Sequence, residues 1–510
     1  MNPTYVIRAD GSAGAFDRFW AAAGIDSLYK LIFTPAGEAL LSRMQEKGTL
    51  RYLRCHHTLS RLSCDGYDDC GGDVYREDAD GRPVYRFERM NAVFRQYLRF
   101  GVKPIVELDF LPDALVRRDG TVDGAETGRH NNRSYPRDWD RWAALLRAFV
   151  QNLIDEFGAE EVRTWYFEVW NEPDNWPVPD WPMFHRLYDV FADCVTGVDE
   201  KLRIGGPGTF TLPFLKDFLE HAARGVNAVT GKRGTRLDFL SCHIYGMSGG
   251  WLTEWPLVLP SVQRFVQQLL WIGRLVTVYP ELRDVPLHLN EWGVCSNYER
   301  TAAEYPPLEI RNSEYSALFM VKLADCIRAL RTRMGLRVEM MLYWGFALED
   351  DRGQAFAGNR DLMTANHLPK PILSAYELLG RMGDRALPVT GPNPGAAAGV
   401  MAAGGPDTVS LLAYHFDEFD LEARGPSMAL ALRLEGLKPG LYRLCRTRLD
   451  RSHHNTYRLW QQGASTEALR QAAALEPDET ETVLTQGTLT LPLTLPAHGL
   501  CLLELTRQED

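Results

Sequence analysis

The sequence predicts a (β/α)8 TIM barrel followed by a smaller β-sandwich, and three observations favour this α/β architecture. Short apolar runs alternate with longer amphipathic segments over about 350 residues, which is typical of a parallel sheet with helices outside it. After about Arg385 the helical periodicity fades, and short strand-like runs separated by turn residues follow. Residues able to do chemistry fall near the carboxyl ends of the earlier runs, where barrels of this kind hold their functional sites.

Seven apolar runs in the first part of the chain have the length of barrel strands. An eighth, near Ala21–Phe33, comes first in the chain and is weak as a strand. Eight units of strand and helix would close a barrel, which we place at residues 15–385. The clear runs are Leu50–His56, Lys103–Phe110, Val162–Trp170, Arg203–Gly206, Leu237–Tyr245, Val285–Glu291 and Val338–Phe346. Helical patterns between them include Asp138–Phe157, Trp181–Val198, Pro260–Val278 and Ser313–Met334.

Residues 386–510 predict the β-sandwich, because short strands there are separated by turn signals. We expect residues 1–14 to add a strand to it, because Thr4–Ala9 precedes the barrel and has no helical partner. We also expect surface loops at Asp417–Gly425 and Thr447–Ala464. The predicted strands are Val400–Ala402, Thr408–Tyr414, Met428–Arg433, Gly440–Arg446, Thr488–Leu495 and Leu500–Leu505.

The composition is that of an ordinary globular protein. The chain has 510 residues, 45% of them hydrophobic and 24% charged, which is enough for a large barrel and a smaller domain. Its net charge of −11 argues against nucleic acid or an anionic membrane as a partner. No coiled coil or obvious interface helix indicates an oligomeric state.

Cysteine usage and the start of the chain favour a cytoplasmic protein with neither a metal nor a cofactor. The first residues lack a basic segment followed by an apolar one, so we expect no signal peptide. No Cys-x-x-Cys motif occurs among the nine cysteines, which argues against a zinc knuckle or a dithiol redox motif. We expect free thiols, with Cys64 and Cys70 as a pair within one loop that oxidation could join.

The stretch Arg163–Pro173 is the most informative part of the chain. Its aromatic and apolar residues predict a strand buried on both faces, and Pro173 ends that strand. The strand therefore delivers the carboxyl group of Glu172 to its end, beside Asn171 and among indole rings. Burial of this kind raises a carboxyl pKa and suits a general acid.

A second glutamate stands in the same setting. Val285–Gly293 is a short strand whose last residues include Asn290, Glu291 and Trp292. Two such glutamates are what a glycosidase needs, because one protonates the leaving oxygen while the other attacks the anomeric carbon or activates water. Tryptophan faces suit sugar C–H surfaces, and amides suit sugar hydroxyls. The pair therefore predicts a glycoside hydrolase.

Several motifs resemble those of glycoside hydrolase family 39, which includes β-xylosidases and α-L-iduronidase. The segment from Glu160 to Pro173 is similar to the β-xylosidase version and is the most specific match. The segment Tyr52–His57 resembles the second-strand motif of the family, which ends in Arg-Gly-His, with Cys55 in place of the glycine. Further similar motifs are Val106–Pro112, Gly205–Pro207, Asp238–Tyr245 and Tyr343–Phe346.

The resemblance implies a retaining double displacement in a (β/α)8 barrel. Glu172, after the fourth strand, would be the acid/base, and Glu291, after the seventh, the nucleophile. Asn171 would bind the sugar 2-hydroxyl. His56 matches the substrate-binding histidine of the family, whereas His57 has no such match and is expected to pack. The other expected substrate contacts are Phe110, His243, Tyr245, Trp344 and one of Glu349, Asp350 and Asp351.

The resemblance favours a neutral pentose, and hence a β-xylosidase. Iduronidases carry a lysine two positions after the sixth-strand histidine, where this chain has the neutral Tyr245. The long segments 65–83, 117–137 and 246–259 could close a pocket, which favours exo over endo action. Other sugars, such as arabinose or glucose, stay open.

Two other classes of function compete with a glycosidase. A non-catalytic glycan-binding protein would keep the aromatic residues but would not need both glutamates. A metal-dependent hydrolase could draw ligands from His56, His243 and the two glutamates, although no His-x-His or His-Glu-x-x-His pair occurs.

Overall fold

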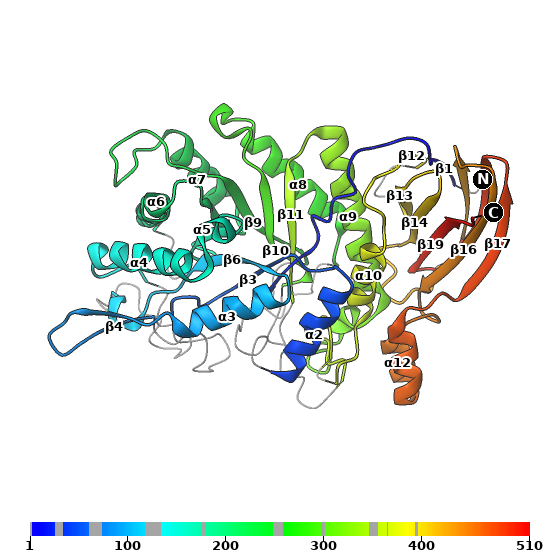
Figure 1. Ribbon diagram of the computed structural model, residues 1–510, viewed down its shortest axis with the longest axis horizontal. Coiled ribbons are helices and arrows are strands. Elements are labelled where there is room, and N and C mark those ends of the chain that lie inside the picture. The colour runs from blue at the N-terminus through cyan, green and yellow to red at the C-terminus, as the bar shows by residue number, and fades with distance from the viewer. Residues whose placement is uncertain are drawn as a thin grey trace.

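A closed barrel of eight parallel strands stands beside a β-sandwich in the computed structural model of the chain (Figure 1). The predicted fold class is confirmed. Around the barrel the strands follow the order β2-β3-β6-β7-β8-β9-β10-β11. They are β2 (Ala22–Ile25), β3 (Tyr52–Cys55), β6 (Lys103–Leu108), β7 (Tyr166–Val169), β8 (Arg203–Thr209), β9 (Phe239–Met247), β10 (Leu287–Cys295) and β11 (Val338–Trp344). The structure describes residues 3–25, 34–60, 74–117, 134–174, 180–247, 259–296, 301–345, 355–364, 366–392 and 396–509.

The first barrel strand, β2, is weak in sequence because three of its four residues are alanine or glycine. Gly24 lies against the indole of Trp344, and a Cβ atom there would come within 2.0 Å of Trp344 Cε3. Small side chains at β2 therefore let a large ring from β11 fill the barrel mouth. The strand pairs with β11 on one side and with β3 on the other, which closes the barrel.

Helices cover the outside of the barrel, and local capping helps to set their starts. Asp138 accepts a hydrogen bond from the Arg141 backbone N–H at the start of α4, and Ser261 does the same for Arg264 in α8. Among the described helices, none has the length and hydropathy to span a bilayer. The helices are α2 (Pro35–Glu46), α3 (Glu88–Arg99), α4 (Trp139–Phe157), α5 (Ala159–Val162), α6 (Trp181–Val198), α7 (Leu212–Arg224), α8 (Val262–Val276), α9 (Glu314–Met334) and α10 (Pro371–Gly380), with 3-10 turns at Asp113–Leu115, Pro280–Leu282 and Pro306–Arg311. A hairpin of β4 (Tyr75–Glu77) and β5 (Pro83–Tyr85) adds to the surface.

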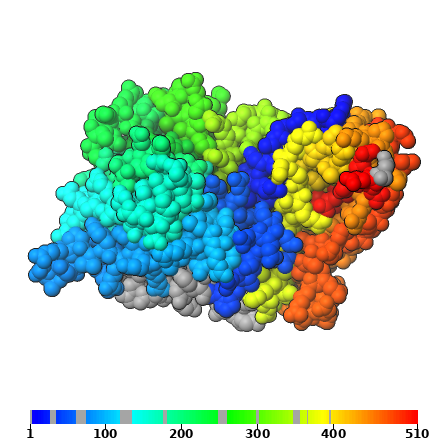
Figure 2. Space-filling model, in the orientation of Figure 1, coloured from blue at the N-terminus to red at the C-terminus, as the bar shows by residue number. Residues whose placement is uncertain are grey.

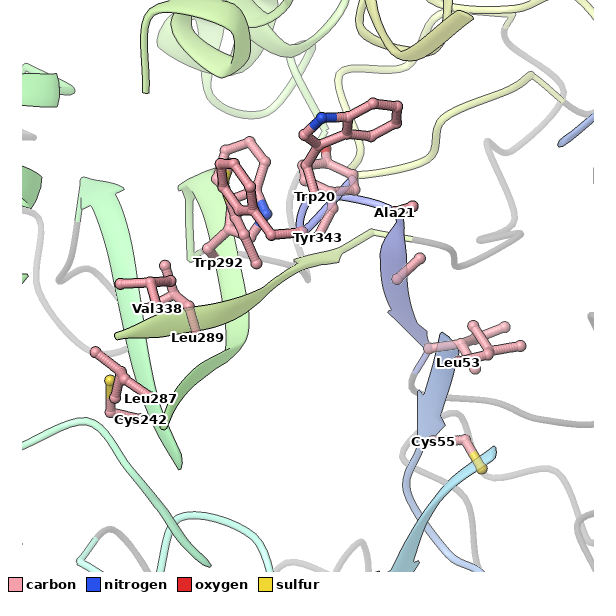
Figure 3. Close-up of a cluster of buried hydrophobic side chains, with 14 of the residues drawn as sticks. Trp20, Ala21, Leu53, Cys55, Cys242, Leu287, Leu289, Trp292, Val338 and Tyr343 are labelled. Atoms are coloured by element: carbon pink, nitrogen blue, oxygen red, sulfur yellow. The ribbon is translucent and has the colours of Figure 1, made fainter. Parts of the chain in front are cut away.

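The main core lies between the barrel strands and these helices. Figure 3 shows apolar side chains of this core on several barrel strands, including Leu53 on β3 and Leu289 on β10. Side chains alternate along each strand, so the neighbours Arg54 and His288 point into the barrel instead. The alternation leaves the barrel interior free to hold polar groups, and the next section describes them.

The sandwich is built from two sheets with leucine-rich inner faces. One sheet has the order β12 (Val389–Thr390), β1 (Thr4–Arg8), β15 (Met428–Glu435) and β18 (Thr488–Leu495). The other has the order β13 (Ala398–Gly404), β14 (Thr408–His415), β19 (Gly499–Arg507), β16 (Gly440–Leu449) and β17 (Glu479–Thr485). Strand β1 pairs with β15 in parallel, and Figure 2 shows the blue N-terminal segment crossing from the barrel to the sandwich. The predicted domain boundaries at residues 14 and 385 stay predictions.

Two predicted surface loops are wrong in part. The segment Thr447–Ala464 contains the end of β16 and the helix α11 (Thr456–Gln461), and α12 (Thr466–Ala474) follows it. Asn455 in this segment is buried, and its amide donates to Glu314 Oε2 at 2.9 Å. In the other segment Glu418 is buried and accepts from the Val262 backbone N–H at 2.7 Å. Contacts with the barrel bury these polar residues, and local patterns carry no sign of such contacts.

Candidate active site

Glu172 leaves the end of β7 on an unusual backbone. Both Trp170 and Glu172 have positive φ angles, of 69° and 44°. Non-glycine residues adopt this conformation rarely, and it is found disproportionately at functional sites. Here the Glu172 N–H donates to the Gly208 carbonyl at 3.0 Å, which fixes the turn. Trp170 is buried and its ring packs on Phe110, so this turn sends the neighbouring Glu172 toward the barrel mouth.

Glu291 is placed by an irregularity within β10. The strand continues to Cys295, so the prediction that it ends near Glu291 is wrong. Its pairing with both neighbouring strands shifts register between Leu289 and Trp292. A shift of this kind re-aims side chains. As a result Asn290 and Glu291, although adjacent, both bond to groups inside the barrel.

The two glutamates meet around one histidine. His243 Nδ1 lies 2.9 Å from Glu172 Oε1 and 3.4 Å from Glu291 Oε2. One oxygen of each carboxyl group and a nitrogen of His243 all lie within 4.8 Å of one another. Carboxyl groups about 5–5.5 Å apart suit retention, whereas inverting enzymes separate them by about 6.5–9.5 Å to admit a water molecule. The geometry therefore suits a retaining pair.

His243 is held as a proton donor between the glutamates. Burial opposes its protonation, but the carboxylates of Glu291 and Glu172 outweigh burial and raise the pKa of His243. A protonated His243 can donate to either carboxyl group. Tyr245 donates to Glu291 Oε2 at 2.8 Å, and burial next to Glu291 raises the pKa of Tyr245 well above its usual value. Tyr245 therefore stays a neutral hydrogen-bond donor to Glu291.

Arg54 is a site residue that sequence reasoning missed. It is fully buried on β3, and its Nη1 donates to Glu291 Oε1 at 3.0 Å. Its Nη2 donates to Asn171 Oδ1 at 3.1 Å, so one guanidinium holds both Glu291 and the neighbour of Glu172. An arginine within an otherwise buried strand, two positions before His56, was the signal that could have identified it.

Two further buried carboxyl groups share Arg54. Glu107 accepts from Arg54 Nη2 at 2.7 Å, and Glu168 accepts from Arg54 Nε at 2.8 Å. Asn290 donates to both oxygens of Glu168 at 2.9 Å. One guanidinium thus faces three carboxyl groups. Burial, together with the neighbouring acids, raises the pKa of Glu107 well above its usual value, and burial with Glu172 nearby also raises that of Glu291.

His56 lies between this network and the barrel mouth. Its Nδ1 is 2.9 Å from Glu107 Oε2, and its Nε2 is 3.7 Å from Glu291 Oε1. Its ring lies 4.5 Å from the ring of Trp344. The structure therefore brings His56 and Trp344 to the predicted site, and their substrate contacts stay predictions. Trp344 is only 2% exposed and packs against Gly24.

Phe110 and His57 lie behind His56. Phe110 is fully buried, and its ring packs on His57 and Trp170 at centroid distances of 5.2 and 5.1 Å. This packing supports the barrel mouth, whereas the predicted sugar contact of Phe110 stays untested. Glu349, Asp350 and Asp351 lie outside the described residues, as do most of the three predicted pocket-closing segments and Cys64 and Cys70. The seven cysteines that the structure describes are free thiols.

Two groups of side chains have the donor atoms for a metal ion. One is Glu172, His243 and Glu291, and the other is His56, Glu107 and Asp109. Arg54 bonds to a carboxyl group in each, at 3.0 Å to Glu291 and 2.7 Å to Glu107. A divalent cation would compete with this guanidinium for the same oxygens and would be repelled by its charge. The residues present therefore fit an arginine-centred acid network better than a metal centre.

Comparison with known proteins agrees with this geometry. The sequence profile described as Glycosyl hydrolases family 39 matches residues 7–472. The chain belongs to glycosyl hydrolase family 39. Members of this family are retaining glycoside hydrolases. The predicted family is confirmed, while the roles of individual site residues stay predictions.

Two β-xylosidases and an iduronidase illustrate the family 39 relatives. The chain is 29% identical to a β-xylosidase of Geobacillus stearothermophilus over 365 residues, which are 68% of this chain and 65%, just under two thirds, of that protein. It is 31% identical to the α-L-iduronidase of Canis lupus familiaris over 193 residues, which are 36% of this chain and 28% of that protein. The crystal structure of a monomeric β-xylosidase from Caulobacter crescentus CB15 is 27% identical, with a TM-score of 0.80 over 99% of this chain and 100% of that one.

Proposed function

We propose that this protein is a retaining exo-glycosidase that releases terminal β-linked xylose from xylosides or xylo-oligosaccharides. The observation that carries the proposal is the meeting of Glu172 and Glu291 around His243, with carboxyl oxygens within 4.8 Å. This spacing is shorter than the roughly 6.5–9.5 Å that inverting enzymes use to admit a water molecule, and it supports attack by a carboxylate.

In the first step Glu291 attacks the anomeric carbon and Glu172 donates its proton to the glycosidic oxygen. The bond to the leaving group breaks, and a covalent glycosyl ester with Glu291 forms. In the second step Glu172, now ionised, takes a proton from water, the water oxygen attacks the anomeric carbon, and Glu291 leaves. Two inversions give net retention.

The surrounding residues hold this pair for reaction. Arg54 and Tyr245 each donate to one oxygen of Glu291, which aims the carboxylate and opposes the effect of burial on its pKa. Glu172 instead contacts His243, whose Nδ1 lies 2.9 Å from Glu172 Oε1. The two carboxyl groups thus have different surroundings, which is how one site separates a nucleophile from an acid.

The residue at position 245 and the bonding of Arg54 support a neutral sugar. The buried cation nearest the nucleophile, Arg54, is already bonded to Glu107, Glu168 and Glu291. A uronic acid would need a cation of its own, and Tyr245 stands where iduronidases have a lysine. Two curated β-xylosidases, whose matches cover 68% and 73% of this chain, also support xylose.

Hydrolysis of p-nitrophenyl β-D-xylopyranoside by the wild type and by Glu291→Ala tests the proposal. We expect wild-type turnover, an inactive variant, and rescue by azide that yields α-xylosyl azide, because azide fills the space of the missing nucleophile. If the wild type does not hydrolyse this substrate but hydrolyses another β-glycoside, the proposed sugar is wrong and the sugar of that glycoside takes its place. A β-configured azide product would contradict the role of Glu291.

Exo action, a cytoplasmic location and the lack of nucleic-acid and membrane partners stay predictions. Release of single xylose units from xylotetraose, without cleavage of internal glycosidic bonds, would support exo action. The relative from Caulobacter crescentus is described as monomeric, and the oligomeric state of this chain stays open.

A further inference from the structure

A cavity of about 520 Å³ opens beside the acid/base. Glu172, His243 and Tyr245 line one end of it, and Glu291 is not among the residues that line it. The rest of the cavity runs between α7 and α8, across the outer side of β9. It is therefore continuous with the proposed catalytic centre but reaches away from the nucleophile.

The position of the cavity assigns it to the leaving group, an assignment that rests on the proposed function. The sugar that forms the ester must contact Glu291. The group that leaves is attached to the oxygen that Glu172 protonates. Space that Glu172 borders and Glu291 does not is therefore where this leaving group extends.

The far wall of the cavity is apolar. Phe210 and Leu212 line it although they are 49% and 39% exposed, which is unusual for large apolar side chains placed side by side. Leu215 from α7, Ile244 from β9 and Ile272 from α8 extend the apolar surface. A ligand that covered this wall would remove apolar area from water and gain affinity.

The threonines of the cavity are already committed to a protein group. Thr209 and Thr211 both donate their hydroxyls to Asp174 Oδ2, the latter at 2.6 Å. The two threonine hydroxyls can still accept a hydrogen bond but have no proton left to donate. Away from the catalytic end, the other polar side chains that the described part of the chain places along the cavity are Gln268 and Ser296. A second sugar would bring more hydroxyls than these groups can pair, and each unpaired buried hydroxyl costs binding free energy.

We infer that the leaving-group site of this enzyme takes an apolar aglycone, alkyl or aryl, in preference to a second sugar residue. The inference narrows the proposed substrate from xylosides or xylo-oligosaccharides to glycosides of apolar alcohols or phenols. It assigns Phe210, Leu212 and Ile272 as residues that determine leaving-group specificity.

Inhibition by stable thioglycosides tests the inference without any bond cleavage. The sugar is the one whose p-nitrophenyl glycoside the wild type hydrolyses fastest. The inhibitors are the methyl and hexyl thioglycosides of that sugar and a thio-linked disaccharide that carries it. We expect the hexyl compound to bind at least about tenfold tighter than the methyl compound, because two buried methylene groups suffice for that factor. We expect the disaccharide to bind more weakly than the hexyl compound.

Substitutions in the apolar wall of the cavity test whether that wall causes the preference for an apolar leaving group. Phe210→Ser combined with Leu212→Asn should weaken the hexyl compound about fivefold or more and leave the methyl compound unchanged. Trp271→Asn is the matched control, because Trp271 is 66% exposed on the same helix as Ile272 and does not line the cavity. Equal binding of methyl and hexyl compounds, or tighter binding of the disaccharide, would overturn the inference. An error in the proposed sugar would have a different result. Another sugar would be hydrolysed fastest, and the methyl, hexyl and disaccharide inhibitors would be compared with that sugar instead.

Discussion

At the scale of single residues, the site depends on how one buried arginine is shared. Arg54 bonds to Glu107, Glu168 and Glu291, and all three acceptors are at most 5% exposed. A single positive charge cannot neutralise three carboxylates. Burial and the neighbouring acids raise the pKa of Glu107 well above its usual value, so the structure favours a proton on this group. His56 contacts Glu107 and lies near Glu291, so it connects the protonated group to the proposed nucleophile.

Glu107→Gln tests this charge distribution through stability at different pH. The pKa of Glu107 is raised in the folded state, so the folded state keeps a proton that the unfolded state releases above about pH 4.5. The contribution of Glu107 to wild-type stability therefore falls as pH rises. The free energy of unfolding of the variant relative to the wild type should therefore increase between pH 4.5 and 7, by up to about 1.4 kcal/mol per pH unit. Urea unfolding at several pH values measures it.

The matched control for this series is Glu46→Gln, at the exposed end of α2. The difference between this control and the wild type should not change over the same pH range. A variant that loses stability relative to the wild type with rising pH would show that Glu107 is ionised in the folded protein.

At the scale of elements, local backbone irregularities aim the catalytic side chains. Glu172 follows β7 on a left-handed residue, and Glu291 sits at a register shift in β10. On the opposite side of the mouth, β2 provides no side chain at Gly24, so that Trp344 can lie beside His56. Each of these three features positions one side chain and involves the backbone of a single strand.

Gly24→Ala should disturb the site through Trp344. Its Cβ atom would lie 2.0 Å from the indole, so the ring or the strand must move. Overpacking of this kind costs about 1–3 kcal/mol of stability, and we expect a lower melting temperature together with reduced kcat/KM.

Gly197→Ala is the control for this substitution. Gly197 lies in helix α6, and nothing stands within 4 Å of the position of an added Cβ atom. The control should stabilise the protein by about 0.5–1 kcal/mol. Wild-type stability and activity in Gly24→Ala would contradict the close contact between β2 and β11.

At the scale of the whole molecule, the sandwich is anchored to the barrel by ion pairs as well as apolar contacts. Arg458 of α11 donates to both oxygens of Glu314 at the start of α9, at 3.0 and 3.1 Å. Glu314 is 1% exposed, and Asn455 donates to it as well. Figure 1 shows α12, next in the chain, projecting from the sandwich on the same side as α2 of the barrel. The helical insertion thus ties the two domains together.

Arg458→Met should destabilise the protein because it leaves the buried Glu314 carboxylate without its cation. The expected loss is about 3 kcal/mol. The hydrogen bonds and charge of Arg458 outweigh burial and lower the pKa of Glu314, so this stabilisation is present above about pH 4.5 and is lost as pH falls through the lower folded value. Urea unfolding of Arg458→Met, Glu314→Gln and the double variant measures the coupling. Additive losses in the double variant would show that the pair is not coupled.

Patterns along the chain were enough for the parts of this protein that depend on near neighbours. Alternating strands and helices predicted the barrel, and an aromatic strand ended by Asn171, Glu172 and Pro173 predicted where a reactive carboxyl group would lie. These signals are local because strand length, side-chain alternation and strand exits depend on adjacent residues. The weak β2 was the exception, since its small residues make sense only against Trp344.

The tertiary structure alone decided which distant groups share a proton or a charge. Arg54 meets Glu107, Glu168 and Glu291 across separations of 53, 114 and 237 residues, and no pattern within one strand contains those pairings. The helix α11 after β16 was likewise missed, because its contacts with Glu314 join residues far apart in the sequence. Burial and charge compensation are properties of the folded assembly, because a polar residue on a strand or in a loop can be solvated or paired with equal ease until its neighbours in space are known.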